Sequence, residues 1–331
     1  MTEWMQEVRS SPTMVVVSSS VVVVILSVVL LGFRKRSTAG AFSKHDPSQC
    51  AVLITGASRG IGLDLATTLA NRGYTVFGTV RSESSYQKLL NQQKESQSDG
   101  TGKIHPIILD VTKPDDFPSA VESVKSKLSG QSQRDLRLIG IVNNAGINPE
   151  GDQWKGGKTP PMELSDPKMA EQVMDTNVLG TIRTTHAFLP LLADFKGDSE
   201  EDSIKESTGH FGRIVLIGSY FGSVAGAIGL PHVYYETSKH ALEGLTDGLR
   251  RGLVQKKSKI TVSLIKPGNI KTDMNDYGEV GPEDVSDTVI DALESNNPKH
   301  RYYPGKVKGM SSYILCTIFE ILPTWLTDKL L

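Results

Sequence analysis

The stretch AVLITGASRGIG, residues 51–62, joins an apolar run to a glycine-rich turn and to the start of a helical pattern. A short apolar run that ends in glycine is typical of a buried strand. The overlapping segment GIGLDLATTLANRG (60–73) has apolar residues at helical spacing and closes on a glycine, which is a common way for a helix to end. A strand, a glycine turn and a helix in this order predict the first unit of an α/β fold.

The same alternation of apolar runs and helical patterns continues as far as residue 268. Further helices are predicted at 166–192 and 234–253. Strands separated by helices predict βαβ units, and therefore a doubly wound parallel sheet of the Rossmann-like kind in a single catalytic domain at 51–310. Ligands of such sheets bind outside the carboxyl ends of the strands, where the glycines and polar residues of this sequence gather. The predicted strands are 51–58, 74–80, 103–110, 136–146, 212–219 and 259–268.

Three segments interrupt this alternation. KESQSDGTGK (94–103) is polar and is predicted to be a loop. GDQWKGGKTPPMELS (151–165) is rich in glycine and proline and follows a strand end, so it is expected to border the ligand site. KGDSEEDSIKESTGH (196–210) is acidic and hydrophilic, and we interpret it as a solvated insertion without a function of its own.

The composition is that of a globular protein and narrows the classes of partner. Of the 331 residues, 38% are hydrophobic and 22% are charged, and the formal net charge is −1. A chain without an excess of basic residues lacks the positive field by which proteins attract nucleic acids, so no nucleic-acid partner is predicted. The two cysteines, Cys50 and Cys316, are far apart, and no Cys/His spacing resembles a metal site. No metal is therefore predicted.

Residues 13–33, TMVVVSSSVVVVILSVVLLGF, carry no charge and have about the 20 residues that cross a bilayer. The basic triplet 34–36 follows at once, whereas residues 1–12 contain a single arginine. By the positive-inside rule, these features predict a single-pass transmembrane anchor at 13–33 with the short segment 1–12 across the membrane. A linker (34–50) would then lead to a cytosolic catalytic domain, with the endoplasmic reticulum as the expected membrane.

A cleaved signal peptide is the competing interpretation of the same segment. The tripeptide AGA (39–41) has the small-x-small form of a cleavage site. Against this interpretation, the residues before the apolar run are not basic, and a basic triplet separates the run from the cut. Cleavage would leave the domain in a lumen or an organelle and not in the cytosol.

The glycine turn TGASRGIG is suited to a phosphate. Gly56, Gly60 and Gly62 permit a tight turn and a close approach of the backbone to a pyrophosphate, and the N-terminus of the next helix offers unpaired N–H groups and a positive dipole end. Ser58 and Ile61 lie in the same turn. Such a pattern alone is a weak indicator of a nucleotide, but a strand before it and a helix after it strengthen the prediction.

The end of the second predicted strand indicates which dinucleotide is bound. An acidic residue there would bind the ribose 2′-hydroxyl of NAD, but the sequence reads GTVRSE (78–83), with Arg81 at the expected place and Arg59 in the glycine turn. Guanidinium groups suit phosphate oxygens, so we expect NADP(H) to be preferred over NAD(H). Glu83 counts against this preference. The alternative interpretation is that Arg59 and Arg81 are solvated surface residues that do not bind the cofactor.

The stretch HVYYETSKHALEGL (232–245) places two tyrosines and a lysine at the start of a predicted helix. Tyr235 and Lys239 are four residues apart and share a helix face, whereas Tyr234 lies over Ser238. If a tyrosine–lysine pair carries out chemistry here, it is therefore Tyr235 with Lys239.

Together, these motifs resemble those of the short-chain dehydrogenase/reductase family, including its membrane-anchored members that act on steroids and retinoids. Six motifs occur in the family's order, which makes coincidence negligible. The resemblance extends over about residues 51–272 and implies an enzyme that interconverts a carbonyl and an alcohol. The motifs are TGASRGIG (55–62), LDVT (109–112), NNAG (143–146), MDTNVLG (174–180), YETSK (235–239) and PGNIKT (267–272).

The resemblance implies a role for each matching residue. Tyr235 would exchange a proton with the substrate oxygen, Lys239 would lower the pKa of that phenol and bind the nicotinamide ribose, and Asn177 would hold a water of the proton relay. Ile270 and Thr272 would fix the carboxamide. The implied cofactor contacts are Gly56, Ser58, Arg59, Gly60, Ile61, Gly62, Arg81, Asp110, Val111, Asn143, Ala145, Gly146, Tyr235, Lys239, Pro267, Gly268, Ile270 and Thr272.

The serine departs from the family's spacing, in which it follows the fifth strand and lies roughly a dozen residues before the tyrosine. Ser219 ends the run GRIVLIGS but is sixteen residues before Tyr235, and Ser223 is twelve before it. Strand geometry fixes a side chain better than loop length does, so Ser219 is the predicted catalytic serine and Ser223 is the alternative. Tyr234 is expected to form pocket wall or packing.

These motifs do not specify the substrate. The C-terminal segment 311–331 is strongly apolar and is expected to contact the membrane or line a pocket, with core packing as the alternative. Together with the predicted anchor, this segment predicts that the substrate is a small hydrophobic carbonyl or alcohol, such as a steroid, a retinoid or an acyl lipid.

Two alternative functions are compatible with the same motifs. One is a catalytically silent NADP-binding scaffold, and the other is a redox-sensing membrane protein. The formation of a homo-oligomer is possible in each case.

Overall fold

The computed structural model describes residues 46–95, 102–129, 136–149, 166–192, 212–226, 232–273, 275 and 278–327. The predicted anchor, the segment before it and most of the linker lie outside the described residues, as do the loops predicted at 151–165 and 196–210. All described residues belong to one compact unit of the chain, 42–331. Among them, no helix combines the length and the apolar character needed to cross a bilayer.

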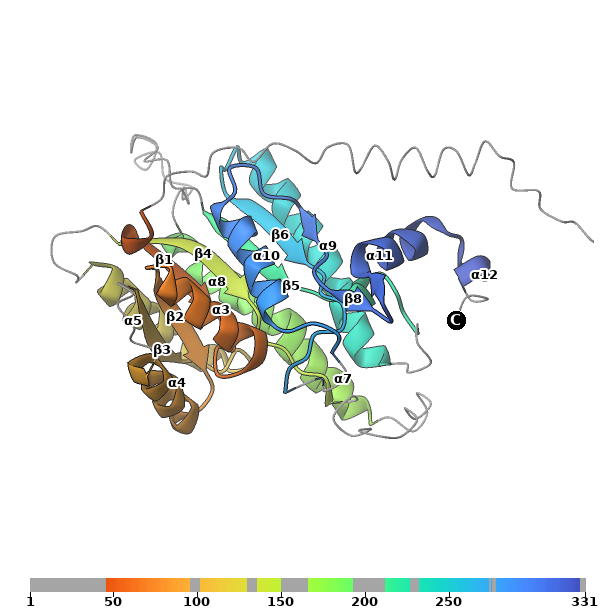
Figure 1. Ribbon diagram of the computed structural model, residues 1–331. Helices are drawn as coiled ribbons and strands as arrows, with labels where there is room; N and C mark the ends of the chain where they lie inside the picture. The colour runs from red at the N-terminus through yellow and green to blue at the C-terminus, as the bar shows by residue number, and fades with distance from the viewer. Residues whose placement is uncertain are drawn as a thin grey trace, which may run out of the picture. The chain divides into compact units, whose positions relative to one another are not determined.

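Within these residues, seven parallel strands form the central sheet (Figure 1). They are β1 (Cys50–Ile54), β2 (Thr75–Val80), β3 (Lys103–Ile108), β4 (Arg137–Asn143), β5 (Arg213–Ile217), β6 (Thr261–Ile265) and β7 (Arg301–Tyr302). Their order across the sheet is β3-β2-β1-β4-β5-β6-β7. The chain enters at β1, moves outward to β3, and then crosses to the other side of β1 for β4. The strand order therefore reverses between β1 and β4, which is where sheets of this kind bind ligands.

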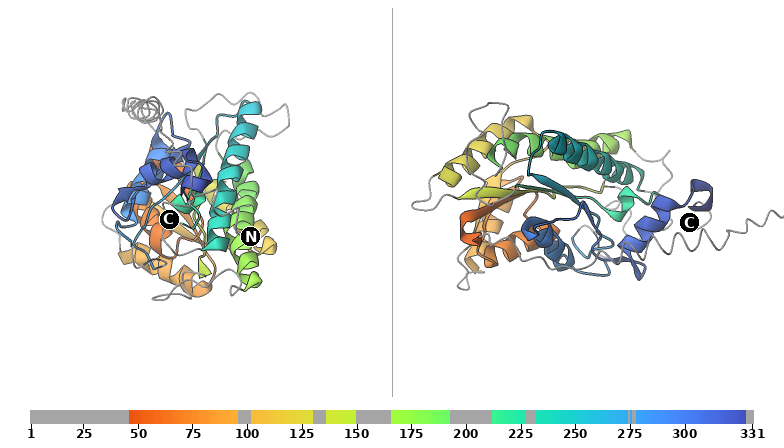
Figure 2. Two further views of the ribbon diagram at one scale, coloured as in Figure 1. Left: turned by 90° about the vertical axis from the view of Figure 1, so that its right-hand side faces the viewer. Right: turned by 90° about the horizontal axis from the view of Figure 1, so that it is seen from above.

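Helices cover both faces of the sheet (Figure 2). One face packs against α3 (Gly60–Asn71), α4 (Glu83–Glu95) and α10 (Glu283–Glu294), and the other against α5 (Phe117–Ser129), α8 (Gly180–Phe188) and α9 (Val233–Gln255). Alternate side chains of β1 enter the two cores. Val52 and Ile54 join the first, whereas Ala51 and Leu53 join the second. Because both faces are covered, the sequence of β1 is a continuous apolar run and not an alternating one.

The helix predicted at 166–192 is correct in position but is not one regular helix. It consists of α7 (Pro167–Met174), a π-helical turn η4 (Asp175–Leu179), α8, and a 3-10 turn η5 (Leu189–Leu191). The helix begins where Asp166 accepts a hydrogen bond from the backbone N–H of Lys168. A π-helical turn inside a helix is often found at a functional site, and this one carries Asn177.

Beyond β6, the chain forms elements that periodicity did not specify. Besides α10 and β7, they are the antiparallel pair β8 (Lys306–Val307) and β9 (Met310–Ser311), followed by α11 (Ser312–Ile321) and α12 (Thr324–Thr327). Helix α11 buries Cys316 against Tyr220 and Val307 in a small third core. Ile314 and Ile321 on the same helix remain exposed. This part of the predicted apolar segment is therefore partly core packing and partly surface.

Candidate active site

A cleft of about 530 Å³ lies at the carboxyl edge of the sheet, where the loops after β1, β2, β3, β4, β5 and β6 meet. Most of the residues predicted from the sequence line it, although they come from segments far apart in the chain. The predicted residues that line the cleft are Gly56, Ser58, Arg59, Gly60, Ile61, Arg81, Asp110, Val111, Ala145, Gly146, Ser219, Tyr235, Lys239, Pro267, Gly268, Ile270 and Thr272.

Three predicted site residues lie behind the lining of the cleft. Gly62 is buried in the first turn of α3. Asn143, 3% exposed at the end of β4, donates a hydrogen bond from Nδ2 to Oγ1 of Thr185 at 3.0 Å. Asn177 is 1% exposed. Among described residues, these three support the walls of the site and do not form its surface.

The glycine turn after β1 has the backbone geometry of an anion site. Gly56 and Gly60 adopt φ angles of +68° and +54°, which side chains with a Cβ rarely adopt. Helix α3 begins at Gly60, and no side chain of the described residues caps it. Its first N–H groups and its positive dipole end are therefore available to a phosphate. A Cβ at Gly62 would collide with the carbonyl oxygen of Gly56, so this glycine allows α3 to pack closely on the turn.

Two residues that the motif analysis did not single out hold this turn in place. Asn144 donates from Nδ2 to the carbonyl oxygens of Thr55 at 2.9 Å and Gly56 at 3.2 Å. Thr55 accepts at Oγ1 from the backbone N–H groups of Asn144 and Ala145, both at 3.0 Å. These bonds lock the turn after β1 to the loop after β4. The NNAG motif contains Asn144, but its spacing does not show which of its two asparagines faces the turn.

The corner between β2 and α4 contributes a guanidinium group and two hydroxyl groups to the cleft. Arg81, Ser82 and Ser85 line it, and the N–H of Ser85 donates to Oγ of Ser82 at 3.2 Å. Glu83, which counted against a phosphate here, is not among the lining residues and accepts a hydrogen bond from Gln87 at 2.8 Å. At this corner, cationic and hydroxyl groups therefore face the cleft without a carboxylate.

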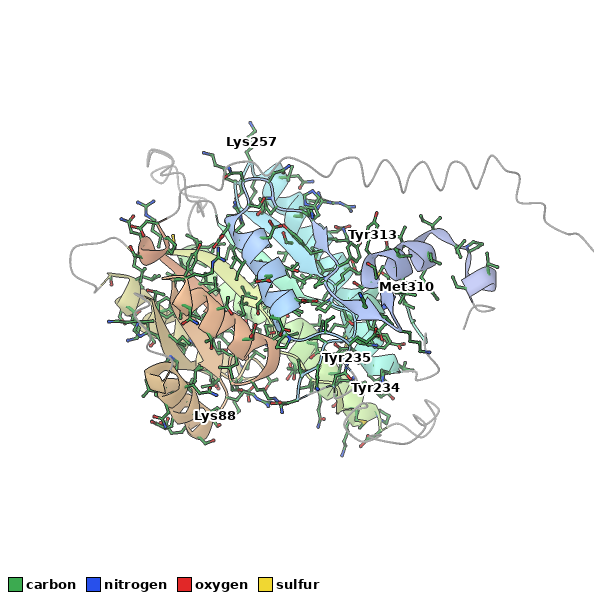
Figure 3. The ribbon with its side chains drawn as sticks, in the orientation of Figure 1. Lys88, Tyr234, Tyr235, Lys257, Met310 and Tyr313 are labelled. Atoms are coloured by element: carbon green, nitrogen blue, oxygen red, sulfur yellow. The ribbon has the colours of Figure 1, made fainter. Side chains whose placement is uncertain are left out.

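Tyr235 and Lys239 lie one turn apart on α9, as predicted, and both line the cleft. Nζ of Lys239 is 5.2 Å from the centre of the Tyr235 ring and donates to the carbonyl oxygen of Ile217, at the end of β5, at 2.9 Å. Tyr234 is half-buried beside Tyr235 (Figure 3) and is not among the lining residues. The helix therefore presents one of its two adjacent tyrosines to the cleft.

Burial moves the pKa values of both groups toward their neutral forms. It raises the pKa of Tyr235 to about 12, and the hydrogen bond with Ser219 acts in the opposite direction. It lowers the pKa of Lys239 to about 8. The family resemblance implied a phenol pKa below its usual value. In the structure it lies above that value, because removal from water disfavours the phenolate. Tyr235 is therefore protonated at neutral pH.

Of the two candidate serines, Ser219 lies at the cleft and Ser223 is not among the residues that line it. Ser219 caps the 3-10 turn η7 (Tyr220–Gly222), where its Oγ accepts from a backbone N–H at 3.2 Å, and it is hydrogen-bonded with Tyr235. The hydroxyl of Ser223 donates instead to Oε1 of Glu320 at 2.5 Å. Because η7 occupies the residues between the two serines, Ser219 keeps the strand-end position despite its longer spacing from the tyrosine.

Asn177 uses its side chain to join three segments. Its Oδ1 accepts from the N–H of Ile147 at 2.8 Å, and its Nδ2 donates to the carbonyl oxygen of Ile147 and to Oγ of Ser238, both at 3.0 Å. Both N–H groups of the amide are thus used by the protein. The predicted contact with a relay water is therefore restricted to Oδ1 or to the backbone of the π-helical turn.

An aromatic cluster beside Tyr235 was not predicted. The ring of Phe221 lies 6.1 Å from that of Tyr235, with the planes at 85°, and 5.9 Å from that of His232. Burial lowers the pKa of His232, so this imidazole is neutral at pH 7. Both residues are visible in the sequence next to the motifs, but no spacing rule places their rings together.

The donor set of the cleft fits a nicotinamide dinucleotide. The uncapped start of α3 and the two glycines with positive φ suit a pyrophosphate. The β2–α4 corner suits a ribose phosphate, and the Tyr235–Lys239 pair lies at the ends of β5 and β6, where a reacting ring would be bound. The sites suited to the pyrophosphate, to the ribose phosphate and to the reacting ring thus all lie in one cleft.

Comparison with known sequences agrees with this geometry. Residues 50–279 match the short chain dehydrogenase family, a span that contains all six motifs. The chain belongs to the short-chain dehydrogenase family. It is therefore an oxidoreductase with a Rossmann-like fold and a nicotinamide cofactor.

Curated relatives share this family but differ in their named substrates. Mitochondrial D-β-hydroxybutyrate dehydrogenase of Bos taurus is 29% identical over 274 residues, covering 81% of this chain and 68% of the relative. Retinol dehydrogenase 7 of Rattus norvegicus is 31% identical over 224 residues, covering 67% and 57%. 3-Ketodihydrosphingosine reductase of Bacteroides thetaiotaomicron is 27% identical over 249 residues, covering 73% and 74%. Membership of the family therefore leaves the substrate of this chain open.

Solved structures confirm the fold of the described residues. A short-chain dehydrogenase from Burkholderia cenocepacia in complex with NADP has a TM-score of 0.60 and 24% identity, covering 85% of this chain and 97% of that protein. A blue fluorescent protein from a metagenomic library in complex with NADPH has a TM-score of 0.59 and 26% identity, covering 77% and 94%. The predicted Rossmann-like sheet is thus confirmed.

Proposed function

We propose that this short-chain dehydrogenase interconverts a carbonyl and an alcohol on a hydrophobic substrate, with NADP(H) as its preferred cofactor. The observation that carries the proposal is the meeting of three groups in the cleft. The Ser219 hydroxyl is hydrogen-bonded with the Tyr235 phenol, and Lys239 lies one turn along α9 from that phenol. A protein that only binds the cofactor has no chemical need for this arrangement.

The chemistry supplied by the nicotinamide when it is bound is hydride transfer. The residues of the chain manage the accompanying proton. In the reductive direction, the Tyr235 phenol donates a proton to the substrate oxygen as negative charge develops there, and the Ser219 hydroxyl donates a second hydrogen bond to the same oxygen. The raised pKa of Tyr235 keeps the phenol protonated until this moment.

Lys239 and Asn177 support this proton transfer. The ammonium of Lys239, 5.2 Å from the Tyr235 ring centre, stabilises the phenolate that remains after the proton has left. Its bond to the Ile217 carbonyl holds it at the strand end. Asn177 fixes the loop after β4 to α9 through Ile147 and Ser238, so that the relay and the reacting groups keep a constant geometry.

The preference for NADP(H) rests on the β2–α4 corner. Arg81 can pair with a ribose 2′-phosphate, and Arg59 in the glycine turn lines the same cleft. Ser82 and Ser85 add hydroxyl donors. Solved neighbours of this fold include a protein with NADP and another with NAD, so the proposal depends on these side chains and not on the neighbours.

A hydrophobic substrate is supported by the surroundings of the reacting groups. The aromatic ring of Phe221 packs edge to face with that of Tyr235, and the neutral imidazole of His232 packs on Phe221. The names of two relatives, retinol dehydrogenase 7 and 3-ketodihydrosphingosine reductase, refer to lipid-like molecules. Steroid, retinoid and acyl-chain carbonyls are the classes that we propose for this chain.

We also propose a single-pass membrane protein with a cytosolic catalytic domain, placed in the endoplasmic reticulum. This proposal rests on the uncharged run at 13–33 and on the basic triplet after it. A membrane location would give the enzyme access to substrates that dissolve in lipid.

The test of the enzymatic proposal is oxidation of NADPH by the purified protein. The carbonyl panel should contain all-trans-retinal, a 3-ketosteroid, 3-ketodihydrosphingosine and acetoacetate. We expect turnover of at least one of the first three and faster turnover with NADPH than with NADH. Tight binding of NADPH without consumption of any carbonyl or of the matching alcohols would support the silent-scaffold alternative instead.

A further inference from the structure

Lys266 is a lysine with no exposed surface that the reaction described above does not use. It lies between the end of β6 and Pro267, which lines the cleft. A buried ammonium group is costly to remove from water unless anionic and polar partners surround it. The partners of the Lys266 ammonium therefore indicate which segments of the fold this residue joins.

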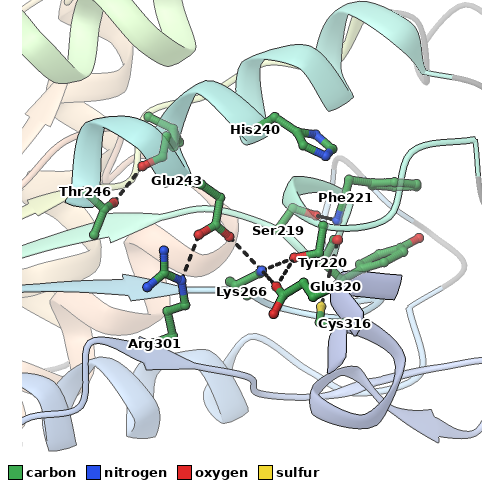
Figure 4. A network of polar contacts seen from close by, with 12 residues as sticks. Ser219, Tyr220, Phe221, His240, Glu243, Thr246, Lys266, Arg301, Cys316 and Glu320 are labelled. Atoms are coloured by element: carbon green, nitrogen blue, oxygen red, sulfur yellow. Dashed lines mark hydrogen bonds and ion pairs between the residues drawn. The ribbon is translucent and has the colours of Figure 1, made fainter. Parts of the chain in front are cut away.

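Three partners from three different segments surround the Lys266 ammonium (Figure 4). It pairs with Oε1 of Glu243 on α9 at 2.6 Å and with Oε1 of Glu320 on α11 at 2.9 Å. It also donates to Oγ of Ser223, just beyond the turn η7. Burial alone would lower the pKa of Lys266, but the bonds to Glu243 and Glu320 keep it above its usual value. The group is therefore charged at neutral pH and acts as a cationic centre.

The segments joined by Lys266 are those that carry the reacting groups. Turn η7 has Ser219 as its cap. Helix α9 carries Tyr235 and Lys239, and Glu243 lies one turn further along the same helix from Lys239. A Cβ added at Gly222, in η7, would lie 3.0 Å from the carbonyl oxygen of Lys239. The turn is thus packed directly on the catalytic turn of the helix.

Helix α11 is attached to the same turn. Sγ of Cys316 lies 3.9 Å from the carbonyl oxygen of Tyr220, and Phe319 packs on the same small core. Glu320 then reaches Lys266 and Ser223 from the end of the helix. Helix α11 therefore touches the serine-bearing turn through an apolar contact and through the ion pair of Glu320 with Lys266.

We propose that Lys266 is a positioning residue that fixes the Ser219 turn against the Tyr235–Lys239 helix, and that Glu320 makes this arrangement depend on the docked helix α11. Ser223, the serine with the family's spacing, belongs to this network and not to the proton transfer. The proposal rests on the proposed function, because it concerns the geometry of the same reaction.

Substitution of Glu320 tests the proposal in the full-length protein. The side chain is 45% exposed, so Glu320→Gln and Glu320→Lys should both fold. Glu320→Lys places a second ammonium group beside Lys266 and should lower kcat about tenfold or more, because small displacements of reacting groups are costly. Glu320→Gln should be milder. The KM for NADPH should stay within about twofold in both, because the glycine turn is untouched.

The matched control is Glu294→Lys. Glu294 pairs with Arg72 at 2.8 Å and likewise joins two parts of the fold, but it does not line the cleft. Its side chain is 12% exposed, so this substitution is at least as demanding for the fold as Glu320→Lys. We expect a lower melting temperature with unchanged kcat. An equal loss of kcat in the control, or an unchanged kcat in Glu320→Lys, would overturn the proposal.

A readout without substrate separates this proposal from the enzymatic one. The amides of Tyr220 and Ser223 are hydrogen-bonded to Pro267 and Tyr220, so their hydrogen exchange reports on the turn. Exchange in residues 218–224 should be about tenfold faster in Glu320→Lys than in the unmodified protein, with no change in the Glu294→Lys control. Unchanged exchange overturns the positioning role. If the enzyme consumes no carbonyl of the panel but exchange in residues 218–224 is faster in Glu320→Lys, the enzymatic proposal is overturned and the positioning role of Lys266 stands.

Discussion

Tyr234 and Tyr235 differ by one position along α9, and that position decides which of them reaches the cleft. Tyr235 lines the cleft with Lys239, and Tyr234 is not among the lining residues. A helix turns by about 100° per residue, so two adjacent side chains never share a face. The helical periodicity therefore predicted the register of the active site, and the structure confirms that Tyr235 and Lys239 lie together.

Replacing Tyr235 with Phe removes the proton donor and leaves the ring in place. We expect kcat to fall about a hundredfold or more, while the dissociation constant for NADPH, measured by fluorescence titration, stays nearly unchanged. Tyr234→Phe is the control and should be mild. If Tyr234→Phe were the inactive variant, the proposed register of the site would be wrong.

The pKa values of the same pair predict the pH dependence of carbonyl reduction. Burial lowers the pKa of Lys239 to about 8, so its ammonium loses its proton as the pH rises through that value. Tyr235, with a pKa of about 12, remains protonated over the same range. We therefore expect kcat to be constant below about pH 7 and to decline above about pH 8. Lys239→Met should be slow throughout and should lack this decline.

Strand ends and helix starts contribute most of the cleft, and two of these junctions have distinct tasks. The junction of β1 and α3 exposes backbone N–H groups, whereas the junction of β2 and α4 exposes side chains. A backbone site recognises any phosphate, because every dinucleotide has the same pyrophosphate. We therefore expect discrimination between dinucleotides to depend on the β2–α4 corner.

Substitution at that corner should change the cofactor preference. Arg81→Asp replaces a guanidinium group with a carboxylate, which repels a 2′-phosphate and accepts hydrogen bonds from a ribose 2′-hydroxyl. We expect the ratio of kcat/KM for NADPH to that for NADH to fall about tenfold or more. Equal kcat/KM values for the two cofactors in the unmodified enzyme would contradict the proposed preference.

The junction of β1 and α3 should tolerate no added side chain at Gly62. A Cβ there collides with the carbonyl oxygen of Gly56 and with Nδ2 of Asn144, so the turn must move. We expect Gly62→Ala to raise the KM for NADPH and to reduce the free energy of unfolding by about 1–3 kcal/mol. Gly252→Ala on α9 is the control, because its Cβ would meet nothing within 4 Å. That substitution should be neutral or slightly stabilising in urea unfolding.

The membrane proposal depends on residues 13–33. If this uncharged run is an anchor, the full-length protein should sediment with membranes and resist carbonate extraction. A variant that lacks residues 1–42 should lose this behaviour and still bind NADPH, because β1 begins at Cys50. Protease added to intact microsomes should digest the catalytic domain and spare a tag at the N-terminus.

Two observations would contradict the anchor. Protection of the domain in intact microsomes would place it in the lumen, and a mature N-terminus near Phe42 would show cleavage after the AGA tripeptide. Either result would favour the signal-peptide interpretation. The assignment to the short-chain dehydrogenase family would be unaffected, because it rests on residues 50–279.

The amino-acid sequence by itself determined the positions of the first six strands, the glycine turn and the tyrosine–lysine register. These features depend on local periodicity and on the conformational freedom of glycine, so neighbouring residues suffice to specify them. The tertiary structure decided which serine meets Tyr235, because η7 takes up the extra residues between Ser219 and Ser223. It also decided the raised pKa of the phenol and the buried network of Lys266. The ion pairs of Lys266 reach Glu243 on α9 and Glu320 on α11, the second of which is 54 positions away, and no local pattern encodes such contacts.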